Sequence, residues 1–421
     1  MTHSRIRIAI VGGGLAGATL ANTLTQLQYA DVEVFESAPE FSERGAAIIL
    51  TSLAQKSLLR ATSSAKEILS KAGAVPMRST RVALGSGSEA GTVVFDMGNT
   101  GDPGVVIHRA SLLRELLAPL PAEILHTGKK LTSLTSSDTG VLLKFEDETC
   151  DHFDAVIGAD GVFGTVRRHV IGDDAFEKYA ASPAGFWDCR NLVPYEEAKE
   201  KLGEQFFEQD RQYGWLGDNA FIMHDILENR TMVQCVISAV ETQSPKERKV
   251  LLNREILMDT LGKWLEGPVA KGMIDLILDQ PNPYGYSEWE HKATPSYKRG
   301  RVCIIGDAAH ATSPWQASGA SMAIEDAMIL GFLFRHVSSA KDIDSAFEAF
   351  DYVRRPRCER IIHSSRHTGE IFCGQDKEVG LNLNKLRAAL SSKWDVVQLD
   401  HETHEKEALD KMEEILERER G

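Results

Sequence analysis

The feature that most constrains the fold is a glycine-rich turn close to the N-terminus. The stretch IRIAIVGGGLAGATLANTL predicts an apolar strand at 6–11 followed by a helix. Between them stand Gly12, Gly14 and Gly17, in GxGxxG spacing. A second predicted strand, DVEVFES, ends at Glu36, nineteen residues after Gly17. GxGxxG alone is a weak signal, but strand, glycines, helix, strand and terminal acid together predict a dinucleotide-binding unit.

Each residue of this motif has a physical role toward a dinucleotide. Gly12 permits the tight turn, and Gly14 lets a pyrophosphate approach the positive end of the helix. Gly17 lets the helix pack closely on the strand, and Glu36 is expected to accept hydrogen bonds from a ribose. A similar run at 85–91 precedes the strand-like TVVF, so we expect a hairpin loop there and only one dinucleotide fold.

Two further turns distinguish this chain from a plain nicotinamide-dependent dehydrogenase. DAVIGADGVFGTVRR is an apolar strand that ends in Asp-Gly. RVCIIGDAAHATSPWQASGA is an apolar strand that ends in Gly-Asp and leads into a predicted helix. A strand that only had to turn would need a single glycine, so this backbone is predicted to approach a ligand. The residues of interest in the two stretches are Asp160, Gly161, Arg167, Gly306, Asp307, Pro314 and Gly319.

These three motifs, in this order, resemble those of the single-component FAD-dependent aromatic hydroxylases of the para-hydroxybenzoate and salicylate hydroxylase type. The fungal salicylate-hydroxylase-like branch is the most similar, and the resemblance runs from Ile6 to about Arg366. It implies an α/β fold: a Rossmann-like FAD-binding domain (GR2 type), a β-sheet substrate domain and C-terminal helices. It also implies FAD as the cofactor and NADPH or NADH as a transient co-substrate.

The resemblance also implies roles for individual residues. The first cluster would bind the ADP half of FAD, and Asp160 would serve both FAD and the nicotinamide cofactor, with Arg167 at a basic position beside it. Asp307 would bond the ribityl chain of the flavin, and Pro314 would lie near the reactive edge of the ring. The other residues that it places near the cofactor are Gly161, Gly306, Gly319, Arg109 in VIHRASLLREL and Arg44 in a nearby loop.

The chain departs from the family pattern in the glycine-rich turns. Ala47, Ala317 and Ser321 stand where glycine is usual, and Gly164 replaces a serine. An added methyl group crowds a backbone that must approach a cofactor. Ala317→Gly is therefore expected to improve the coupling of oxidation to hydroxylation if the methyl group touches the ring. If the methyl group points away, the substitution is expected to lower stability by roughly 0.4–1 kcal/mol.

The chain is predicted to divide into four segments. Residues 1–179 and 291–370 would form the two parts of a discontinuous FAD-binding domain. Residues 180–290 would form the substrate domain, joined by part of 75–108, because alternation such as FIMHDI suits a half-exposed sheet over the flavin. Residues 371–421 would form a C-terminal helical segment, whose amphipathic last helix is expected to dock on its own protein.

The candidates for substrate chemistry lie in the predicted substrate sheet. An electrophilic oxygen donor needs an electron-rich ring, so a histidine near its ordinary pKa of ~6.5 could take the proton of a phenol. His224 is the candidate for that role, with packing inside the sheet as the alternative. Arg190 could hold a substrate carboxylate through two parallel hydrogen bonds, with an ion pair at the surface or with the FAD domain as the alternative. Trp187 and Tyr213 are expected to pack rather than to recognise substrate.

The combined prediction is an FAD-dependent monooxygenase that uses NAD(P)H and O2 to hydroxylate a phenolic or aromatic acid. Salicylate converted to catechol with loss of carbon dioxide is the leading case. One alternative is the same machinery acting on a larger polyketide or terpenoid by hydroxylation, epoxidation or dearomatisation. Another alternative is a flavin-binding protein with little turnover.

The composition argues against other classes of protein. A net charge of -14 does not suit a nucleic-acid binder, which needs a basic stripe to neutralise phosphates. The six cysteines are scattered without a CxxC pair, which favours free thiols over a disulfide or metal framework. No uninterrupted apolar run reaches the ~18 residues of a membrane span. We expect a cytoplasmic monomer or homodimer whose partners are a small aromatic substrate and O2.

Overall fold

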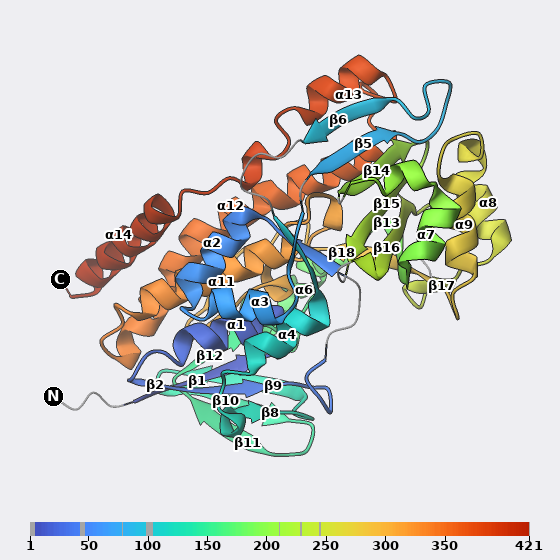
Figure 1. Ribbon diagram of the computed structural model, residues 1–421. Helices are drawn as coiled ribbons and strands as arrows, with labels where there is room; N and C mark the ends of the chain where they lie inside the picture. Colours follow the sequence, from blue (N-terminus) through green and yellow to red (C-terminus); the bar gives the residue numbers. More distant parts are fainter. Residues whose placement is uncertain are drawn as a thin grey trace.

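In the part of the chain that the structure describes, two large sheets organise the fold, and two three-stranded sheets accompany them (Figure 1). The computed structural model describes residues 5–42, 47–77, 79–97, 104–209, 211–227, 230–243 and 246–420. The mixture of parallel sheet, antiparallel sheet and helices confirms the predicted α/β class. Within these residues, none of the helices combines the length and the apolar character that a bilayer span requires.

The six-stranded sheet has the parallel core that the first motif predicts. Its strand order is β19-β20-β12-β1-β2-β8, and all pairs are parallel except β19 with β20. The strands are β1 (Ile6–Val11), β2 (Ala30–Phe35), β8 (Leu125–His126), β12 (Ala155–Gly158), β19 (Lys298–Arg299) and β20 (Val302–Ile304). Because β20 joins from the second half of the chain, distant sequence segments complete one sheet.

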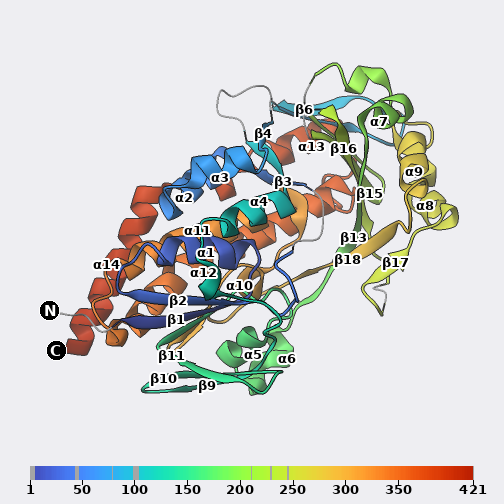
Figure 2. The same cartoon turned by 60° about the horizontal axis from the view of Figure 1, so that its bottom comes forward.

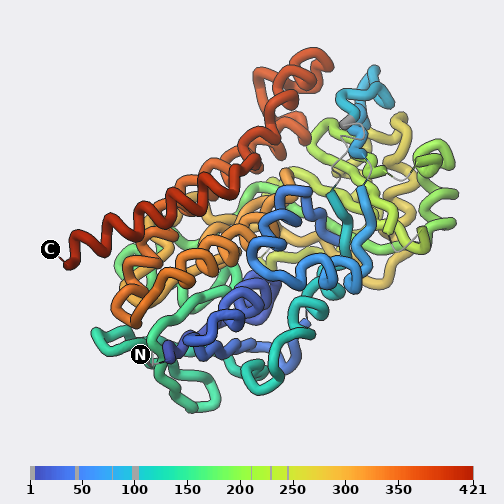
Figure 3. The backbone as a smooth tube through the Cα atoms, turned by 60° about the vertical axis from the view of Figure 1, so that its left-hand side comes forward, coloured from blue at the N-terminus to red at the C-terminus, as the bar shows by residue number. Residues whose placement is uncertain are grey.

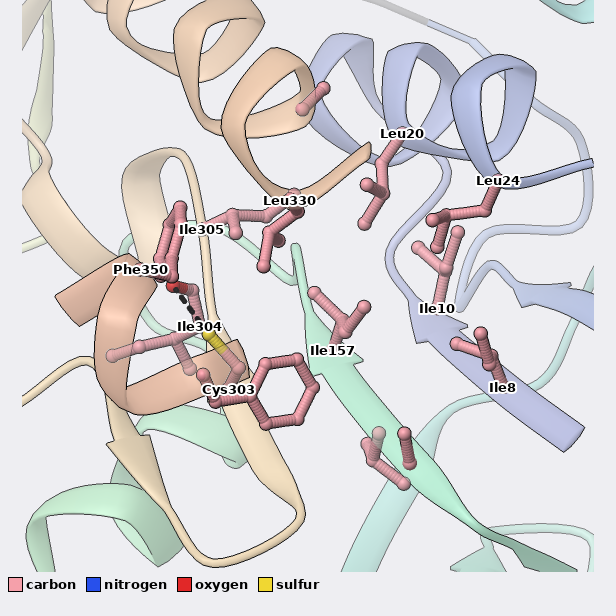
Figure 4. Packing of buried hydrophobic residues seen from close by; sticks show 14 of the residues in the cluster. Ile8, Ile10, Leu20, Leu24, Ile157, Cys303, Ile304, Ile305, Leu330 and Phe350 are labelled. Carbon is pink, nitrogen blue, oxygen red and sulfur yellow. Dashed lines mark hydrogen bonds between the residues drawn. The ribbon is translucent and has the colours of Figure 1, made fainter. Parts of the chain in front are cut away.

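Both faces of this sheet are covered, which explains why β1 is almost continuously apolar. Helices α1 (Leu15–Leu24) and α11 (Gly319–Phe334) lie on one face. A three-stranded sheet lies on the other face and contains β9 (Leu131–Ser137), β10 (Gly140–Phe145) and β11 (Cys150–Phe153). Figure 4 shows Leu20 and Leu330 directed at Ile10 and Ile157, and all four are fully buried. Burying each such side chain contributes roughly 1.5–3 kcal/mol.

The eight-stranded sheet has the order β17-β18-β13-β16-β15-β14-β5-β6 and is antiparallel apart from the β5–β14 pair. Its strands are β5 (Thr80–Leu84), β6 (Val93–Met97), β13 (Ser182–Pro194), β14 (Gln212–Gly217), β15 (Ala220–Leu227), β16 (Met232–Val240), β17 (Lys249–Leu251) and β18 (Tyr284–Glu290). β5 and β6 pair as a hairpin around the glycine-rich run at 85–91, so the predicted hairpin is confirmed.

One face of this sheet is packed against α7 (Tyr195–Leu202), α8 (Arg254–Leu261) and α9 (Ala270–Leu278) (Figure 2). Trp187 and Tyr213 belong to this packed face, which confirms their predicted packing role. The other face borders a cavity. The prediction of a half-exposed sheet is therefore wrong. The alternation in FIMHDI separates the face covered by helices from the face that borders the cavity.

The remaining elements close the ends of the two large sheets. A small sheet has the order β3-β7-β4 and contains β3 (Ala47–Leu50), β4 (Val75–Pro76) and β7 (Val105–His108). The remaining α-helices are α2 (Ser52–Ala61), α3 (Ala65–Lys71), α4 (Arg109–Leu117), α5 (Thr165–Ile171), α6 (Asp173–Tyr179), α10 (Asp307–His310), α12 (Ile343–Phe372), α13 (Leu383–Leu390) and α14 (His401–Arg420).

The C-terminal helices dock on the rest of the chain, as predicted. Figure 3 shows α14 running along the helices that cover the six-stranded sheet. Ala408 and Met412 of α14 are buried in the same core as β1. In α13, Arg387 donates to the carbonyl oxygens of Val93 and Val94 on β6, at 2.8 and 3.1 Å. The four-segment domain division stays a prediction.

Candidate functional site

A cavity of about 880 Å³ lies between the six-stranded sheet, the eight-stranded sheet and the N-terminus of α11. The carboxyl ends of parallel strands meet at one sheet edge, so the turns after β1, β2, β12 and β20 all reach it. The predicted residues that line the cavity are Gly12, Gly14, Glu36, Arg109, Asp160, Gly161, Arg190, Asp307, Pro314 and Gly319. Arg44 lies outside the described residues.

The first glycine cluster forms a pocket for an anion at one end of this cavity. Gly12 has a φ of +108°, and a Cβ there would collide with the carbonyl of Ala159. Gly14 is the N-cap of α1, whose first turn has neither a side-chain cap nor an acidic residue. The helix amides are therefore available to a phosphate. Gly17 does not line the cavity; it lets α1 approach the carbonyl of Gly12.

Glu36 is held in place by the backbone that surrounds it. Its Oε2 accepts from the amide of Gly13 at 2.9 Å, and its Oε1 accepts from the amide of Ala38 at 2.8 Å. The carboxylate therefore orients the glycine turn as well as facing the cavity. Its remaining lone pairs suit the hydroxyl groups of a ribose.

Asp160 combines a structural contact with an unused acceptor. Its Oδ2 accepts from the amide of Val166 at 3.0 Å, at the start of α5. Its Oδ1 has no hydrogen-bond partner among the described residues. Burial raises the pKa of Asp160 to about 6. A Cβ at Gly164, where serine is usual in the family, would collide with Oδ1 in this arrangement.

The structure places Arg167 away from the cavity, whereas the sequence prediction placed it beside the cofactor. Its side chain is buried and does not line the cavity. The guanidinium donates to the hydroxyl of Thr294 and to the carbonyls of Ala308 and Tyr179, at 2.7–3.0 Å. Because α5 directs the Arg167 side chain into the protein interior, the guanidinium anchors the turn after β20 from the side away from the cavity. A nicotinamide cofactor in the cavity could not contact it in this position.

Buried charges hold the turn that presents Asp307. Asp307 begins α10 and faces the cavity, whereas Gly306 is buried, with its amide donating to Asp326 Oδ2 at 2.9 Å. The same carboxylate contacts His310 Nε2 at 2.5 Å and accepts from Arg354 Nε at 2.9 Å. Burial opposes the charged imidazole, but Asp326 raises the pKa of His310 well above its ordinary value. The sequence signal for this network was two acids inside the apolar helix SMAIEDAMIL.

Arg190 faces the cavity from β13. Its Nε donates to Asp188 Oδ2 at 2.6 Å, and this carboxylate raises the pKa of Arg190 above its ordinary value. Arg190 pairs with Val236 on β16, which also lines the cavity. Pro314 lines the same cavity from the turn before α11. The structure therefore brings together two of the three predicted catalytic residues.

His224, the third predicted catalytic residue, lies on the face of the sheet that points away from the cavity. Its ring stacks on Phe207, Tyr213 and Trp215, at centroid distances of 5.0, 5.3 and 5.3 Å. It is fully buried on the helix-covered face and does not line the cavity. Burial lowers its pKa to about 4. A neutral imidazole in an aromatic stack cannot receive a proton from a substrate on the opposite face.

His224→Phe is therefore expected to leave kcat/KM close to that of the unaltered protein, because phenylalanine preserves the aromatic stack. The measurement is substrate-stimulated NAD(P)H oxidation by the FAD-loaded variant. A loss of about a hundredfold with FAD still bound would be typical of a missing general base and would restore the sequence prediction.

Sequence reasoning missed several polar residues of the site. Gln212 and Gln234 line the cavity from β14 and β16, and the neighbouring Asp225 connects them. The sequence signal that could have revealed Gln212 and Gln234 was a polar side chain inside an otherwise apolar strand. Lys129 and Lys130 line the cavity just after β8, paired with Asp147 and Glu146.

Ala317 lines the cavity in a left-handed backbone conformation, with a φ of +52°. This region costs a residue with a Cβ roughly 1–2 kcal/mol. We therefore expect Ala317→Gly to leave stability unchanged or to raise it by up to about 1 kcal/mol, after the entropy of glycine is subtracted. For a methyl group that points away from the ring, the sequence alone predicted a loss of stability; the left-handed backbone of Ala317 reverses that expectation.

Thermal unfolding of the FAD-free protein measures this effect, and hydrogen peroxide formed per NAD(P)H reports on coupling. Ala320→Gly is the matched control, since Ala320 lies in the first turn of α11 and should lose stability. A lower melting temperature for Ala317→Gly, equal to that of the control, would contradict the prediction.

The residues present fit FAD. Gly14 leaves the amides at the N-terminus of α1 without a side-chain acceptor, as Ser318 does for α11. Glu36 and Asp160 offer oxygen atoms that can accept hydrogen bonds from ribose hydroxyls and from other donor groups of the cofactor. Asp307 faces the space between the two helix ends. The parallel sheet presents these groups at its carboxyl edge, and the cavity separates this edge from the antiparallel sheet. This arrangement is that of a flavoprotein of the FAD-binding type.

Residues 5–365 match the FAD binding domain family, and the chain belongs to that family. It is 31% identical to the 6-methylsalicylate 1-monooxygenase of Aspergillus terreus, over 99% of this chain and 95% of that protein. It is 29% identical to the salicylate hydroxylase of Pseudomonas putida, over 93% of this chain and 91% of that protein.

A solved structure described as a salicylate hydroxylase substrate complex has a similar fold. Its TM-score is 0.83 at 22% identity, covering 96% of this chain and 98% of that chain. The chain is thus an FAD-dependent monooxygenase of the salicylate hydroxylase type, and NAD(P)H use is typical of its family.

Proposed function

We propose that this monooxygenase hydroxylates a phenolic acid of the salicylate type. The observation that carries the proposal is Arg190, a cation held by Asp188 on the wall of the cavity that Pro314 also lines. A guanidinium in this place suits a ring carboxylate, because two parallel hydrogen bonds also fix the orientation of the ring. The names of the two relatives support the same class of substrate.

FAD is proposed to occupy the part of the cavity between α1 and α11. The residues that would hold it are Gly12, Gly14, Glu36, Arg109, Asp160, Gly161, Asp307 and Gly319. Gly17 and Gly306 would act indirectly, through the shape of the two turns. When bound and reduced by NAD(P)H, FAD supplies an electrophilic oxygen atom from O2.

The protein's contribution is to bind and orient the ring. With Nε engaged by Asp188, the Nη groups of Arg190 are directed to the substrate carboxylate. If oxygen enters at the carbon that bears the carboxylate, the bond to that group breaks and its electron pair returns to the ring. Carbon dioxide leaves, one oxygen atom of O2 ends in catechol and the other in water. NAD(P)H provides the two electrons.

The test is a panel of small aromatic compounds assayed with the FAD-loaded protein. Salicylate and 6-methylsalicylate are compared with benzoate, which lacks the hydroxyl group, and with phenol, which lacks the carboxylate. We expect the two hydroxy acids to stimulate NAD(P)H oxidation most, with products identified by mass. A larger phenol of the polyketide type is assayed in parallel, and stimulation by that compound alone would favour a polyketide substrate. The absence of any stimulation would favour a flavin-binding protein with little turnover.

A further inference from the structure

Asp225 is a buried carboxyl group for which the proposed function has given no role. It lies on β15 beside His224, is 2% exposed, and points to the opposite face of the sheet. Phe221 and Met223 of the same strand line the large cavity. Because side chains alternate along a strand, Asp225 shares their face. Its Oδ1 has no hydrogen-bond partner within the described part of the chain.

Two glutamines connect this carboxyl group to the cavity. The Nε2 atoms of Gln212 and Gln234 each donate to Asp225 Oδ2 at 3.3 Å. Their carbonyl oxygens accept from the hydroxyl of Thr80 at 3.2 Å and from the amide of Ala47 at 3.0 Å. Both side chains are therefore fixed in orientation. Each amide group keeps a second N–H that can bond a hydroxyl group or a water molecule in the cavity.

Asp225 lines a smaller pocket of about 290 Å³. Met77 and Gln212 line both this pocket and the large cavity, so the two spaces adjoin. Arg211 and Arg230 also line the smaller pocket. Asp225 thus lines the smaller space and is connected to the larger one through Gln212 and Gln234.

We propose that Asp225 accepts the proton of the substrate's ring hydroxyl, passed through a bridging water beside Gln212 and Gln234. The inference rests on the proposed function, since it requires a phenolic substrate. The O–H bond of the ring hydroxyl breaks, its electron pair stays on the ring oxygen, and the proton ends on the carboxylate of Asp225. The ring becomes electron-rich, as attack on an electrophilic oxygen atom requires.

The electrostatic surroundings of Asp225 suit this exchange. Burial raises its pKa to about 6, while Gln212, Gln234 and the charge of Arg190 act in the opposite direction. Arg211 and Arg230 are the other charged side chains that line its pocket among the described residues, and no second carboxyl group does. Above about pH 6 the group is a carboxylate that can accept a proton, and below it the group is already protonated.

The test compares Asp225→Asn with His224→Phe, neighbours on opposite faces of β15. In the unaltered enzyme, kcat/KM for salicylate should fall as the pH drops through about 6. In Asp225→Asn this dependence should disappear, and kcat/KM at about pH 8 should be at least tenfold lower. The substrate Kd, measured from the flavin absorbance, should stay nearly constant. His224→Phe should keep the pH profile of the unaltered enzyme.

Ring-fluorinated salicylates separate proton transfer from a structural role. Fluorine makes the hydroxyl more acidic, so these substrates should recover part of the activity of Asp225→Asn, which a distorted site would not allow. Gln212→Met, which interrupts the connection and keeps Asp225, should show the same recovery. An unchanged pH profile in Asp225→Asn, or an unchanged substituent dependence in either variant, would overturn the inference. An unaltered enzyme that oxidises no phenolic acid would instead overturn the proposed function on which it rests.

Discussion

Arg190→Gln is expected to lower kcat/KM for a carboxylated phenol by about 30- to 1000-fold, which corresponds to roughly 2–4 kcal/mol for the loss of one partner from a charge pair. The effect should appear mainly in KM, because the guanidinium binds the carboxylate in the ground state as well as while oxygen enters the ring, before carbon dioxide leaves. Loss of orientation should also raise the hydrogen peroxide formed per NAD(P)H. Steady-state kinetics with salicylate, combined with peroxide detection, measures both effects.

A substrate without a carboxylate provides the internal control for Arg190. Phenol, where it is turned over at all, should lose much less activity in the variant. Arg254→Gln is the matched control variant, since Arg254 forms an exposed ion pair with Asp275 on the helices behind the sheet. Equal losses with salicylate and phenol would mean that Arg190 supports the sheet through Asp188 and does not hold the carboxylate.

Asp307→Ala is expected to weaken FAD binding by about ten- to a hundredfold, since a hydrogen bond to a charged acceptor contributes roughly 1.5–3 kcal/mol. Asp307 faces the cavity, while Asp326 and Arg354 hold the turn from behind. The turn should therefore persist in the variant, and the stability of the FAD-free protein should change little. Titration of the FAD-free protein with FAD, followed by flavin fluorescence, gives the affinity.

Asp307→Asn is the conservative control, because it keeps one acceptor oxygen at the same place, and it should lose less affinity. Asp326→Asn should lower both FAD affinity and the melting temperature, since it removes the charge that pairs with His310 and Arg354. Unchanged FAD affinity in Asp307→Ala would show that Asp307 only completes the turn.

The cofactor half of the site could be predicted from the sequence because its signals are local. Gly12 is needed for a backbone conformation that side chains disfavour, and Gly14 begins a helix immediately after a strand. Glu36, Asp160 and Asp307 each follow a strand that the apolar pattern reveals. Parallel strands place their carboxyl ends at one sheet edge, so residues far apart in sequence had to gather there.

The substrate half depended on tertiary structure, because its signals are not local. Alternation along β15 puts His224 and Asp225 on opposite faces but does not tell which face the helices cover. That choice was made by aromatic packing of His224 with Phe207, Tyr213 and Trp215.

Long-range contacts decided the rest. A Rossmann-like sheet with a dinucleotide motif follows from local sequence alone, since each step depends on backbone sterics within a few residues. The inward direction of Arg167 and the left-handed backbone of Ala317 depend on neighbours that only the folded chain provides. The junction of Gln212, Asp225 and Gln234 joins three strands of one sheet. Only tertiary structure could decide it, because burial and hydrogen-bond partners are properties of the packed sheet.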